Sequence, residues 1–194
     1  MILHKWGTVE YERAMKMMRE IHSLAKREGK NHLIVCSHPK IFTVGAEGRK
    51  KEWKIRVVHT DRGGSVTCHS EGQSVFYFCF SIGTPSLFYA KVKRVFSEVF
   101  EKLDERIFFD KKRPGFYIEN RKLSSLGFRY EDGVSLHGVS VNIDVDLKFH
   151  SLVNPCDLKG VLATSLRKEG IFIEKEEFEE MVVEKVCEIF DESV

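Results

Sequence analysis

The pattern of apolar and polar residues in the first part of the chain predicts one helix followed by two strands. From Tyr11 to Arg27 the apolar residues recur at helical spacing, and Gly29 follows as a plausible end of the helix. His32 to Cys36 and Ile41 to Val44 are short apolar runs, separated by the turn-like Ser37-His38-Pro39. We therefore expect an amphipathic helix that leads into a pair of strands.

The middle of the chain predicts further strands and a second helix. Ile55 to His59 and Ser65 to Cys68 look extended, and Gln73 to Ile82 is almost continuously apolar, which is typical of a buried central strand. A second helix is expected to begin at Thr84-Pro85-Ser86. From Gly115 to Asp146, strand-like runs alternate with turn signals and predict an antiparallel meander with Lys122 on its second strand and His137 on its third.

The end of the chain completes the predicted architecture. Leu147 to Asn154 is expected to be a loop, and Glu174 to Phe190 has the pattern of a third amphipathic helix. No internal repeat or linker divides the sequence, so we expect one domain over residues 1–194. The order of elements predicts the α+β class: a mixed or antiparallel sheet with helices packed on one of its faces.

Composition narrows the class of protein. The 194 residues include 31 basic and 29 acidic side chains, a balance that does not favour a nucleic-acid partner. The first residues are too soon interrupted by polar ones to resemble a signal peptide, and no apolar run is long enough to span a membrane, so we expect a cytoplasmic protein. The five cysteines are scattered and contain no Cys-x-x-Cys pair, which favours reduced thiols and disfavours a structural zinc site.

Two residues could together perform nucleophilic chemistry. Cys156 follows Pro155 in a short polar segment where its thiol could reach solvent, although a buried inert cysteine is the commoner case and suits Cys36, Cys79 and Cys187. Lys122 precedes small polar residues that leave room for a ligand, although an ordinary solvated lysine is the simpler interpretation. A lysine near a cysteine can favour the reactive thiolate, so the pair is a candidate acyl-transfer couple.

A glycine-containing segment and two histidines are candidate substrate contacts. The segment Arg62 to His69 begins Arg-Gly-Gly, which allows a close approach of the backbone to a ligand or simply forms a hairpin turn. His69 and His137 could orient a carbonyl group or be satisfied polar groups of a sheet. A zinc site built from Cys68, His69, His137 and Cys156 lacks any recognised spacing, and we expect no metal. The chain also has no phosphate-binding loop of the Walker A or Gly-x-Gly-x-x-Gly kind, which argues against an ATP-driven ligation.

Taken together, these segments resemble the lipoyl(octanoyl) transferase family, whose enzymes move an octanoyl group from acyl carrier protein onto lipoyl domains. Four ordered blocks carry the resemblance: Arg62 to His69 with Gly72-Gln73, Arg121 to Gly127 with Arg129, Leu136-His137-Gly138 with Asn142 and Asp146-Leu147, and Asn154-Pro155-Cys156. The resemblance implies the α+β fold of the biotin/lipoate protein ligase superfamily. It also implies an enzyme without cofactor or metal, in which Cys156 forms an acyl thioester and Lys122 lowers its pKa or moves its proton.

The resemblance further implies which residues contact the substrate and which proteins are partners. The implied substrate-binding residues are Arg62, Gly63, Gly64, Ser65, Val66, Thr67, Cys68, His69, Ser125, Leu126, Gly127, His137, Gly138, Val139 and Ser140. The implied donor is octanoyl-acyl carrier protein, and the implied acceptors are lipoyl domains of 2-oxoacid dehydrogenases or the glycine cleavage H protein. Such partners tend to be acidic, so basic residues near the site are docking candidates, namely Lys50, Lys51, Lys111, Lys112 and Arg113.

The sequence departs from the family pattern at three places. The family usually has Tyr where Cys68 stands, Gly-Pro where Ser70-Glu71 stand, and Gly where Asp157 follows the cysteine. The first two changes bear on the shape of the pocket, and Asp157 disfavours a thiolate unless Lys122 offsets its charge. Two other functions remain open from the residues: an ATP-dependent lipoate–protein ligase, and a non-catalytic module that binds an acyl group or a cofactor.

Overall fold

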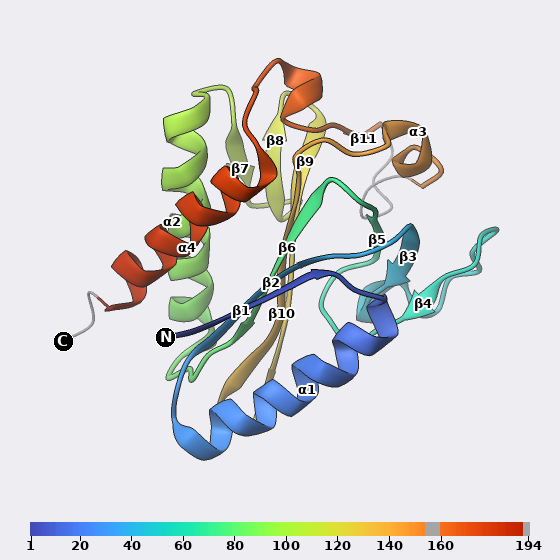
Figure 1. Ribbon diagram of the computed structural model, residues 1–194. Helices are drawn as coiled ribbons and strands as arrows, with labels where there is room; N and C mark the ends of the chain where they lie inside the picture. The colour runs from blue at the N-terminus through green and yellow to red at the C-terminus, as the bar shows by residue number, and fades with distance from the viewer. Residues whose placement is uncertain (154–159, 192–194) are drawn as a thin grey trace.

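The computed structural model describes residues 1–153 and 160–191, and its largest element is an eight-stranded mixed sheet (Figure 1). Most neighbouring strands are antiparallel, but β1 is parallel to β2 and β11 is parallel to β9. In spatial order the strands are β1 (Ile2–Thr8), β2 (His32–Ser37), β6 (Gln73–Cys79), β10 (Val134–Asn142), β9 (Arg121–Glu131), β8 (Gly115–Ile118) and β7 (Phe108–Asp110), with β11 (Leu162–Ala163) beside β9. The prediction of a mixed sheet in an α+β fold is confirmed.

A second, three-stranded sheet lies beside the main one. Its strands are β4 (Val58–His59), β3 (Ile41–Val44) and β5 (Val66–His69), in that order. The short helical turn η1 (Ala46–Gly48) follows β3, and only the last two residues of the expected strand from Ile55 to His59 are extended. We call this unit the small sheet.

Helices cover both faces of the main sheet. Helix α1 (Tyr11–Glu28) packs against β2, β6 and β10 on one face. Helices α2 (Pro85–Leu103) and α4 (Lys175–Asp191) contact each other and pack on the opposite face (Figure 1). The expectation that all helices lie on one face is therefore wrong.

Strand β6 gives the physical reason for the two covered faces. Phe76, Phe78 and Phe80 point into the core shared with α2 and α4, whereas Val75 and Tyr77 point into the core shared with α1. Because successive side chains of a strand point to opposite faces, a continuously apolar strand needs a cover on each side. The apolar run from Gln73 to Ile82 already carried this information.

Two other elements differ from the sequence-based expectations. Residues 147–150, expected to be a loop, form the short helix α3 (Leu147–His150), which begins where the Asp146 carboxylate accepts hydrogen bonds from the Lys148 and Phe149 amides. Strand β1 was not anticipated because its side chains are mostly exposed and mix polar with apolar residues. The remaining helices and the antiparallel meander are confirmed, and the short turn η3 (Arg167–Glu169) follows β11.

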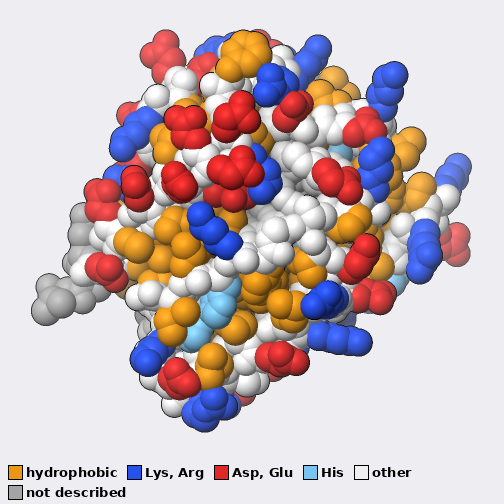
Figure 2. Space-filling view, in the orientation of Figure 1, with side chains coloured by type: hydrophobic (Ala, Val, Ile, Leu, Met, Phe, Trp, Pro, Cys, Tyr) orange, Lys and Arg blue, Asp and Glu red, His pale blue; other side chains and the backbone are white. Residues whose placement is uncertain are grey.

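The surface is uneven in charge. Figure 2 shows acidic side chains gathered on the side of α4, and basic side chains on the projecting loop that leads to β4. This loop carries Lys50 and Lys51, both exposed. No helix in the described part of the chain is both long and apolar enough to cross a membrane.

Candidate functional site

Lys122 is buried on β9, and its ammonium group is held by the turn before β8. The side chain is only 3% exposed, its Nζ donates a hydrogen bond to the Pro114 carbonyl at 3.1 Å, and Nζ lies 5.4 Å from the centre of the Tyr117 ring. A carbonyl oxygen and a ring face both stabilise a positive charge. Lys122 is therefore not the solvated strand-end lysine of the simpler interpretation.

Gly115 provides the space that the Lys122 side chain occupies. A Cβ atom at position 115 would lie 2.7 Å from Lys122 Cε and 2.4 Å from the Ser124 carbonyl oxygen. Tyr117 fixes the same turn, because its buried hydroxyl donates a hydrogen bond to the Arg113 carbonyl at 2.8 Å. The turn from Arg113 to Tyr117 thus positions the ammonium group through the Pro114 carbonyl, the Tyr117 ring and the space left by Gly115.

A β-bulge places Lys122 and Ser125 on the same face of the sheet. Phe116 pairs with Ser124 and Tyr117 pairs with Lys122, so Leu123 is an extra residue on β9. In a regular strand, residues three apart point to opposite faces. With the bulge, Lys122 and Ser125 both line a cavity of about 30 Å³, which we call the lysine cavity.

A second cavity continues from the lysine cavity along β9 and β10. It has a volume of about 40 Å³, and Thr67, Ser125 and Ser140 line both cavities. We call it the glycine cavity, because Gly63, Gly64, Gly127 and Gly138 form much of its wall. The sequence-predicted residues that line it are Arg62, Gly63, Gly64, Thr67, His69, Ser125, Leu126, Gly127, His137, Gly138, Val139 and Ser140. These residues come from two sheets and three separate segments of sequence.

Three of the predicted substrate-binding residues lie elsewhere. Cys68 lines the lysine cavity, and Ser65 lines a separate surface cavity of about 400 Å³. Val66 is fully buried in β5 and lines neither the glycine nor the lysine cavity. Val66 alternates with Thr67 and His69 along the strand, which explains why it points away from the glycine cavity.

The close approach of two glycine segments forms one wall of the glycine cavity. The Gly63 amide donates a hydrogen bond to the Phe128 carbonyl at 3.0 Å, and a Cβ atom at Gly127 would lie 2.9 Å from the Gly63 carbonyl oxygen. Gly64 has a φ of 83°, a conformation that favours glycine. The Arg-Gly-Gly segment thus brings the turn before β5 against β9. The close approach to a ligand that the sequence suggested stays a prediction.

His137 lies at the end of the glycine cavity that is remote from Lys122. Its backbone is in the left-handed region, with a φ of 63°, which is uncommon for a residue with a side chain. The residues Val139 and Val141 point toward α2 and α4, so regular alternation would place His137 there too. Instead its ring lies on the α1 face, in contact with Tyr77 and hydrogen bonded through Nε2 to Asp61 at 2.6 Å.

The pair of Asp61 and His137 is an anionic carboxylate beside a neutral imidazole. The hydrogen bond from His137, aided by the charge of Arg19, lowers the pKa of Asp61 well below its usual range. Burial lowers the pKa of His137, and this effect exceeds the opposing effect of Asp61. Since Nε2 donates to the carboxylate, Nδ1 is the unprotonated ring nitrogen, and it is buried without a hydrogen-bond partner among the described residues.

Other buried histidines near the cavities are also neutral. Burial lowers the pKa of His69 well below its usual value, and the pKa of His150 to about 4. His69 hydrogen bonds through Nδ1 to Gln73 Oε1 at 2.7 Å, and His150 hydrogen bonds through Nε2 to Ser70 Oγ at 3.0 Å. A neutral histidine can donate and accept hydrogen bonds without introducing charge.

The cysteines differ in their surroundings. Cys156, the predicted nucleophile, lies outside the described residues, as do Asn154, Pro155 and Asp157. Burial raises the pKa of the Cys68 thiol, which opposes its use as a nucleophile. Cys36 and Cys79 are buried as expected, but Cys187 is only half-buried, so that expectation is wrong.

The basic residues that the sequence offered for docking lie on two surface segments. Lys50 and Lys51 are exposed beside η1, and Lys111 and Lys112 are exposed in the turn between β7 and β8. Arg113 is half-buried and its Nε pairs with the Asp110 carboxylate at 2.6 Å. At these positions, the exposed lysines could contact an acidic surface of a partner protein.

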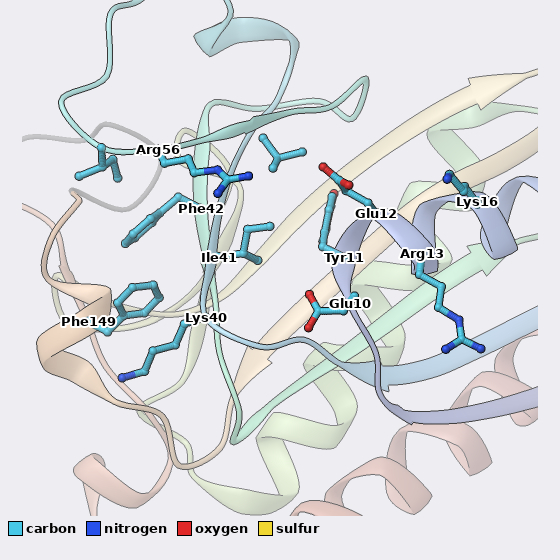
Figure 3. Close-up of a pocket in the computed structure, with 12 residues that line it drawn as sticks. Glu10, Tyr11, Glu12, Arg13, Lys16, Lys40, Ile41, Phe42, Arg56 and Phe149 are labelled. Carbon is cyan, nitrogen blue, oxygen red and sulfur yellow. The ribbon is translucent and has the colours of Figure 1, made fainter.

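A larger cavity, of about 700 Å³, is an open groove outside the two inner cavities (Figure 3). It lies between the start of α1, β3 and α3, where the rings of Phe42 and Phe149 are 4.5 Å apart. Charged residues of both signs line it, including Glu12 and Arg56. The groove shares only Tyr11 with the glycine cavity and contains none of the sequence-predicted site residues.

Sequence reasoning missed several residues that line the inner cavities. Tyr11 and Tyr77 look like ordinary members of apolar patterns, and His150 was assigned to a loop. The tyrosines could have been recognised because a buried phenol hydroxyl needs a polar partner. For Tyr77 this partner is His38 Nε2, at 2.7 Å from the hydroxyl oxygen.

Among residues 1–153 and 160–191, no three His, Cys, Asp or Glu side chains come together as a metal site requires.

Comparison with known proteins identifies relatives over most of the chain. Residues 10–187 match the family model of the lipoyl protein ligase A/B catalytic domain. The chain is 31% identical to a probable octanoyltransferase of Pyrobaculum calidifontis, over 97% of this chain and 84% of the relative. It is 34% identical to an octanoyltransferase of Alkalilimnicola ehrlichii, over 85% of this chain and 80% of the relative.

Solved structures share the fold at lower sequence identity. Lipoate-protein ligase A bound with ATP has a TM-score of 0.77 at 13% identity, covering 98% of this chain and 85% of that one. Biotin protein ligase from Leishmania major in complex with biotinyl-5-AMP has a TM-score of 0.65 at 12% identity, covering 98% of this chain and 75% of that one. The expected biotin/lipoate protein ligase fold is confirmed.

We predict that Gly115→Ala destabilises the protein and displaces the Lys122 side chain. The added methyl group would overlap Lys122 Cε and the Ser124 carbonyl, and overpacking of this kind costs roughly 1 to 3 kcal/mol. The free energy of unfolding, measured with urea, gives the change. Gly83→Ala is the matched control, because a Cβ atom there meets nothing within 4 Å, and equal stability of the two variants would contradict the prediction.

We also predict that acid destabilises the protein partly through Asp61 and His137. Both groups have a pKa that folding lowers, so the folded state binds fewer protons than the unfolded state. The free energy of unfolding is therefore highest near neutral pH. It declines below about pH 6.5, where His137 begins to bind a proton in the unfolded state, and declines further below about pH 4, where Asp61 does the same. In Asp61→Asn, the free energy of unfolding should fall less steeply below pH 4 than in the wild type. Parallel curves would show that Asp61 makes no contribution.

Proposed function

The chain belongs to the lipoyl protein ligase A/B catalytic domain family, and we propose that it is an octanoyltransferase that acts through a thioester on Cys156. The relatives of about 31% to 34% identity that bear the name octanoyltransferase support this choice over an ATP-dependent ligase. The ligases among the solved structures share the fold at 12% to 15% identity, which carries no argument for their chemistry.

One structural observation supports the proposal most strongly. The buried Lys122 lines one of two neighbouring cavities that share Thr67, Ser125 and Ser140, and four glycines line the second cavity together with larger side chains such as Tyr77 and His137. This arrangement suits acyl transfer through a cysteine, because a nearby cation favours the thiolate and the adjacent cavity offers space for the acyl chain. The conformation of Cys156 is not part of this support, because it lies outside the described residues.

The first half of the reaction transfers the acyl group to the enzyme. The Cys156 thiolate attacks the carbonyl carbon of octanoyl-acyl carrier protein, a new thioester bond forms, and the bond to the phosphopantetheine sulfur breaks. The departing thiolate takes a proton from the Lys122 ammonium and leaves as the thiol, so that Lys122 becomes the neutral amine. Lys122 favours the Cys156 thiolate through its positive charge, which Pro114 and Tyr117 stabilise.

The second half transfers the acyl group to a lipoyl domain. The ε-amine of the acceptor lysine attacks the acyl-enzyme, an amide forms, and Cys156 is released as the thiolate. A proton leaves the attacking amine during this step, and Lys122, which is the neutral amine after the first half-reaction, accepts it and becomes an ammonium again. Thioester exchange is nearly balanced and amide formation is favourable, so the reaction needs no nucleotide.

The proteins that donate and accept the octanoyl group are expected to dock near the exposed basic residues. Lys50 and Lys51 lie on the loop beside η1, and Lys111 and Lys112 lie in the turn next to Pro114. The second turn also holds the ammonium of Lys122, so a partner bound there would be close to the reacting end. Complementary charge would mainly raise the rate of association.

We predict a covalent octanoyl adduct on Cys156. Incubation with octanoyl-acyl carrier protein should raise the intact mass by one octanoyl group, and peptide mapping should place the group on Cys156. Cys156→Ser should form no adduct. Cys68→Ala is the control and should retain it, because burial raises the pKa of the Cys68 thiol and makes it a poor nucleophile.

Other results would contradict the proposal in distinct ways. An adduct on Cys68 would show that Cys68, and not Cys156, is the nucleophile. Octanoylation of a lipoyl domain from free octanoate and ATP, without acyl carrier protein, would identify a ligase. Tight binding of octanoate with neither adduct nor product would identify a non-catalytic binding module.

A further inference from the structure

We propose that His137 determines the acyl chain length by closing the far end of the glycine cavity. This inference rests on the proposed acyl transfer, and it assigns to His137 the role of a specificity-determining residue. His137 would contact the terminal methyl group of the chain, at the opposite end of the cavity from Lys122.

Cavities follow one another in line along the paired strands β9 and β10. On β10, Asn142 lines the lysine cavity, Ser140 lines both inner cavities, and Gly138 lines the glycine cavity. Next along the strand, His137 lines the glycine cavity and also a third cavity of about 480 Å³ beneath α1, which we call the α1 cavity. The residues that line both the glycine cavity and the α1 cavity are Tyr11 and His137. These two side chains therefore form the partition between them.

The spacing along β10 suits a chain of eight carbons. Ser140, at the junction of the two inner cavities, is three residues from His137, which corresponds to about 10 Å along a strand. A saturated octanoyl chain has seven bonds from its carbonyl carbon to its terminal methyl, which extend over about 8 to 9 Å at the rise per bond of an extended backbone. With the carbonyl group at Ser140, the methyl group reaches His137.

Strand pairing fixes this length, whereas the width can change. The glycine cavity has a volume of about 40 Å³, below the roughly 300 Å³ at which small-molecule pockets begin, so a chain enters only if flanking side chains move. Gly138 pairs with both Tyr77 on β6 and Gly127 on β9, so the backbone beneath the cavity lies inside the sheet. Adjustment is therefore expected in the side chains above the sheet and not along β10.

Several contacts hold the imidazole of His137 at the end of the cavity. Nε2 is 2.6 Å from Asp61 Oδ1, and Asp61 in turn pairs with Arg19 and with Arg129, the latter at 3.4 Å. The His137 amide contacts Met18 Sδ on α1 at 3.4 Å. A left-handed backbone is unfavourable for a residue with a side chain, so these contacts maintain a conformation that the residue alone would disfavour.

The test is a competition among acyl chain lengths. Octanoyl-, decanoyl- and dodecanoyl-acyl carrier protein are mixed with the protein, and the initial rate of each acyl-enzyme adduct is followed by intact mass. His137→Gly removes the His137 side of the partition and suits a φ of 63°, so the dodecanoyl to octanoyl ratio should rise at least tenfold over the wild type. His137→Asn, which also tolerates the left-handed region, should give a smaller rise. Leu87→Ala, an exposed residue of α2, is the control and should keep the wild-type ratio.

A binding measurement separates chain length from catalysis. In a Cys156→Ser background, adding the His137→Gly change should increase thermal stabilisation by dodecanoate relative to octanoate, since at equal concentration the ligand that binds the folded state more tightly stabilises it more. If folded His137→Gly and His137→Asn keep the wild-type preference in both measurements, the inference is wrong while the proposed function stands. If the wild type forms no adduct with any chain length, the proposed function fails and the inference fails with it.

Discussion

The side chain of Gln73 joins the two sheets between which the inner cavities lie. From β6 it accepts a hydrogen bond from His69 of the small sheet at 2.7 Å, and it donates one to Asn142 Oδ1 on β10 at 2.9 Å. Asn142 continues the network with a 2.8 Å hydrogen bond to the Thr164 carbonyl beyond β11. Because all of these groups are buried, the loss of one partner would leave others unsatisfied, at a cost of roughly 1 to 3 kcal/mol each. The position of the small sheet over β9 and β10, and hence the cavity, depends on this network.

Two local irregularities direct side chains into that cavity. The bulge at Leu123 puts Lys122 and Ser125 on one face of β9, and the left-handed conformation of His137 turns its ring away from the α2 and α4 core. Both features interrupt the alternation that makes a strand regular. The bulge lies on β9 at the reacting end of the cavities, and His137 lies on the neighbouring strand β10 at the closed end. Strain of this kind is typical of functional sites, where neighbouring contacts maintain it.

Much of the fold could be predicted because local patterns determine it. The helical spacing from Tyr11 to Arg27 and the turns within 115–146 each specify an element without reference to the rest of the chain. The placement of helices on both faces was missed, although the continuous apolar character of β6 required it. Strand β1 was missed because an exposed strand beside β2 has no strong apolar pattern.

The candidate site was predictable in its segments but not in its geometry. The Arg-Gly-Gly segment, the Lys122 segment and the His137 segment converge on one cavity, as the blocks of sequence implied. The bulge at Leu123 could not be predicted, because it arises from pairing with β8 and not from the local sequence. The partnership of His137 with Asp61 likewise joins residues far apart in the chain. The assignment of Cys156 still rests on the sequence.

In the proposed mechanism, the ammonium group of Lys122 makes the sulfur of Cys156 reactive. The rate at which iodoacetamide alkylates Cys156, measured as a function of pH on the peptide that contains it, tests this role in the wild type and in Lys122→Met. We expect a midpoint below the ordinary cysteine value of about 8.5 in the wild type, and a midpoint at least about one unit higher in the variant. The same midpoint in both proteins would show that Lys122 does not activate Cys156.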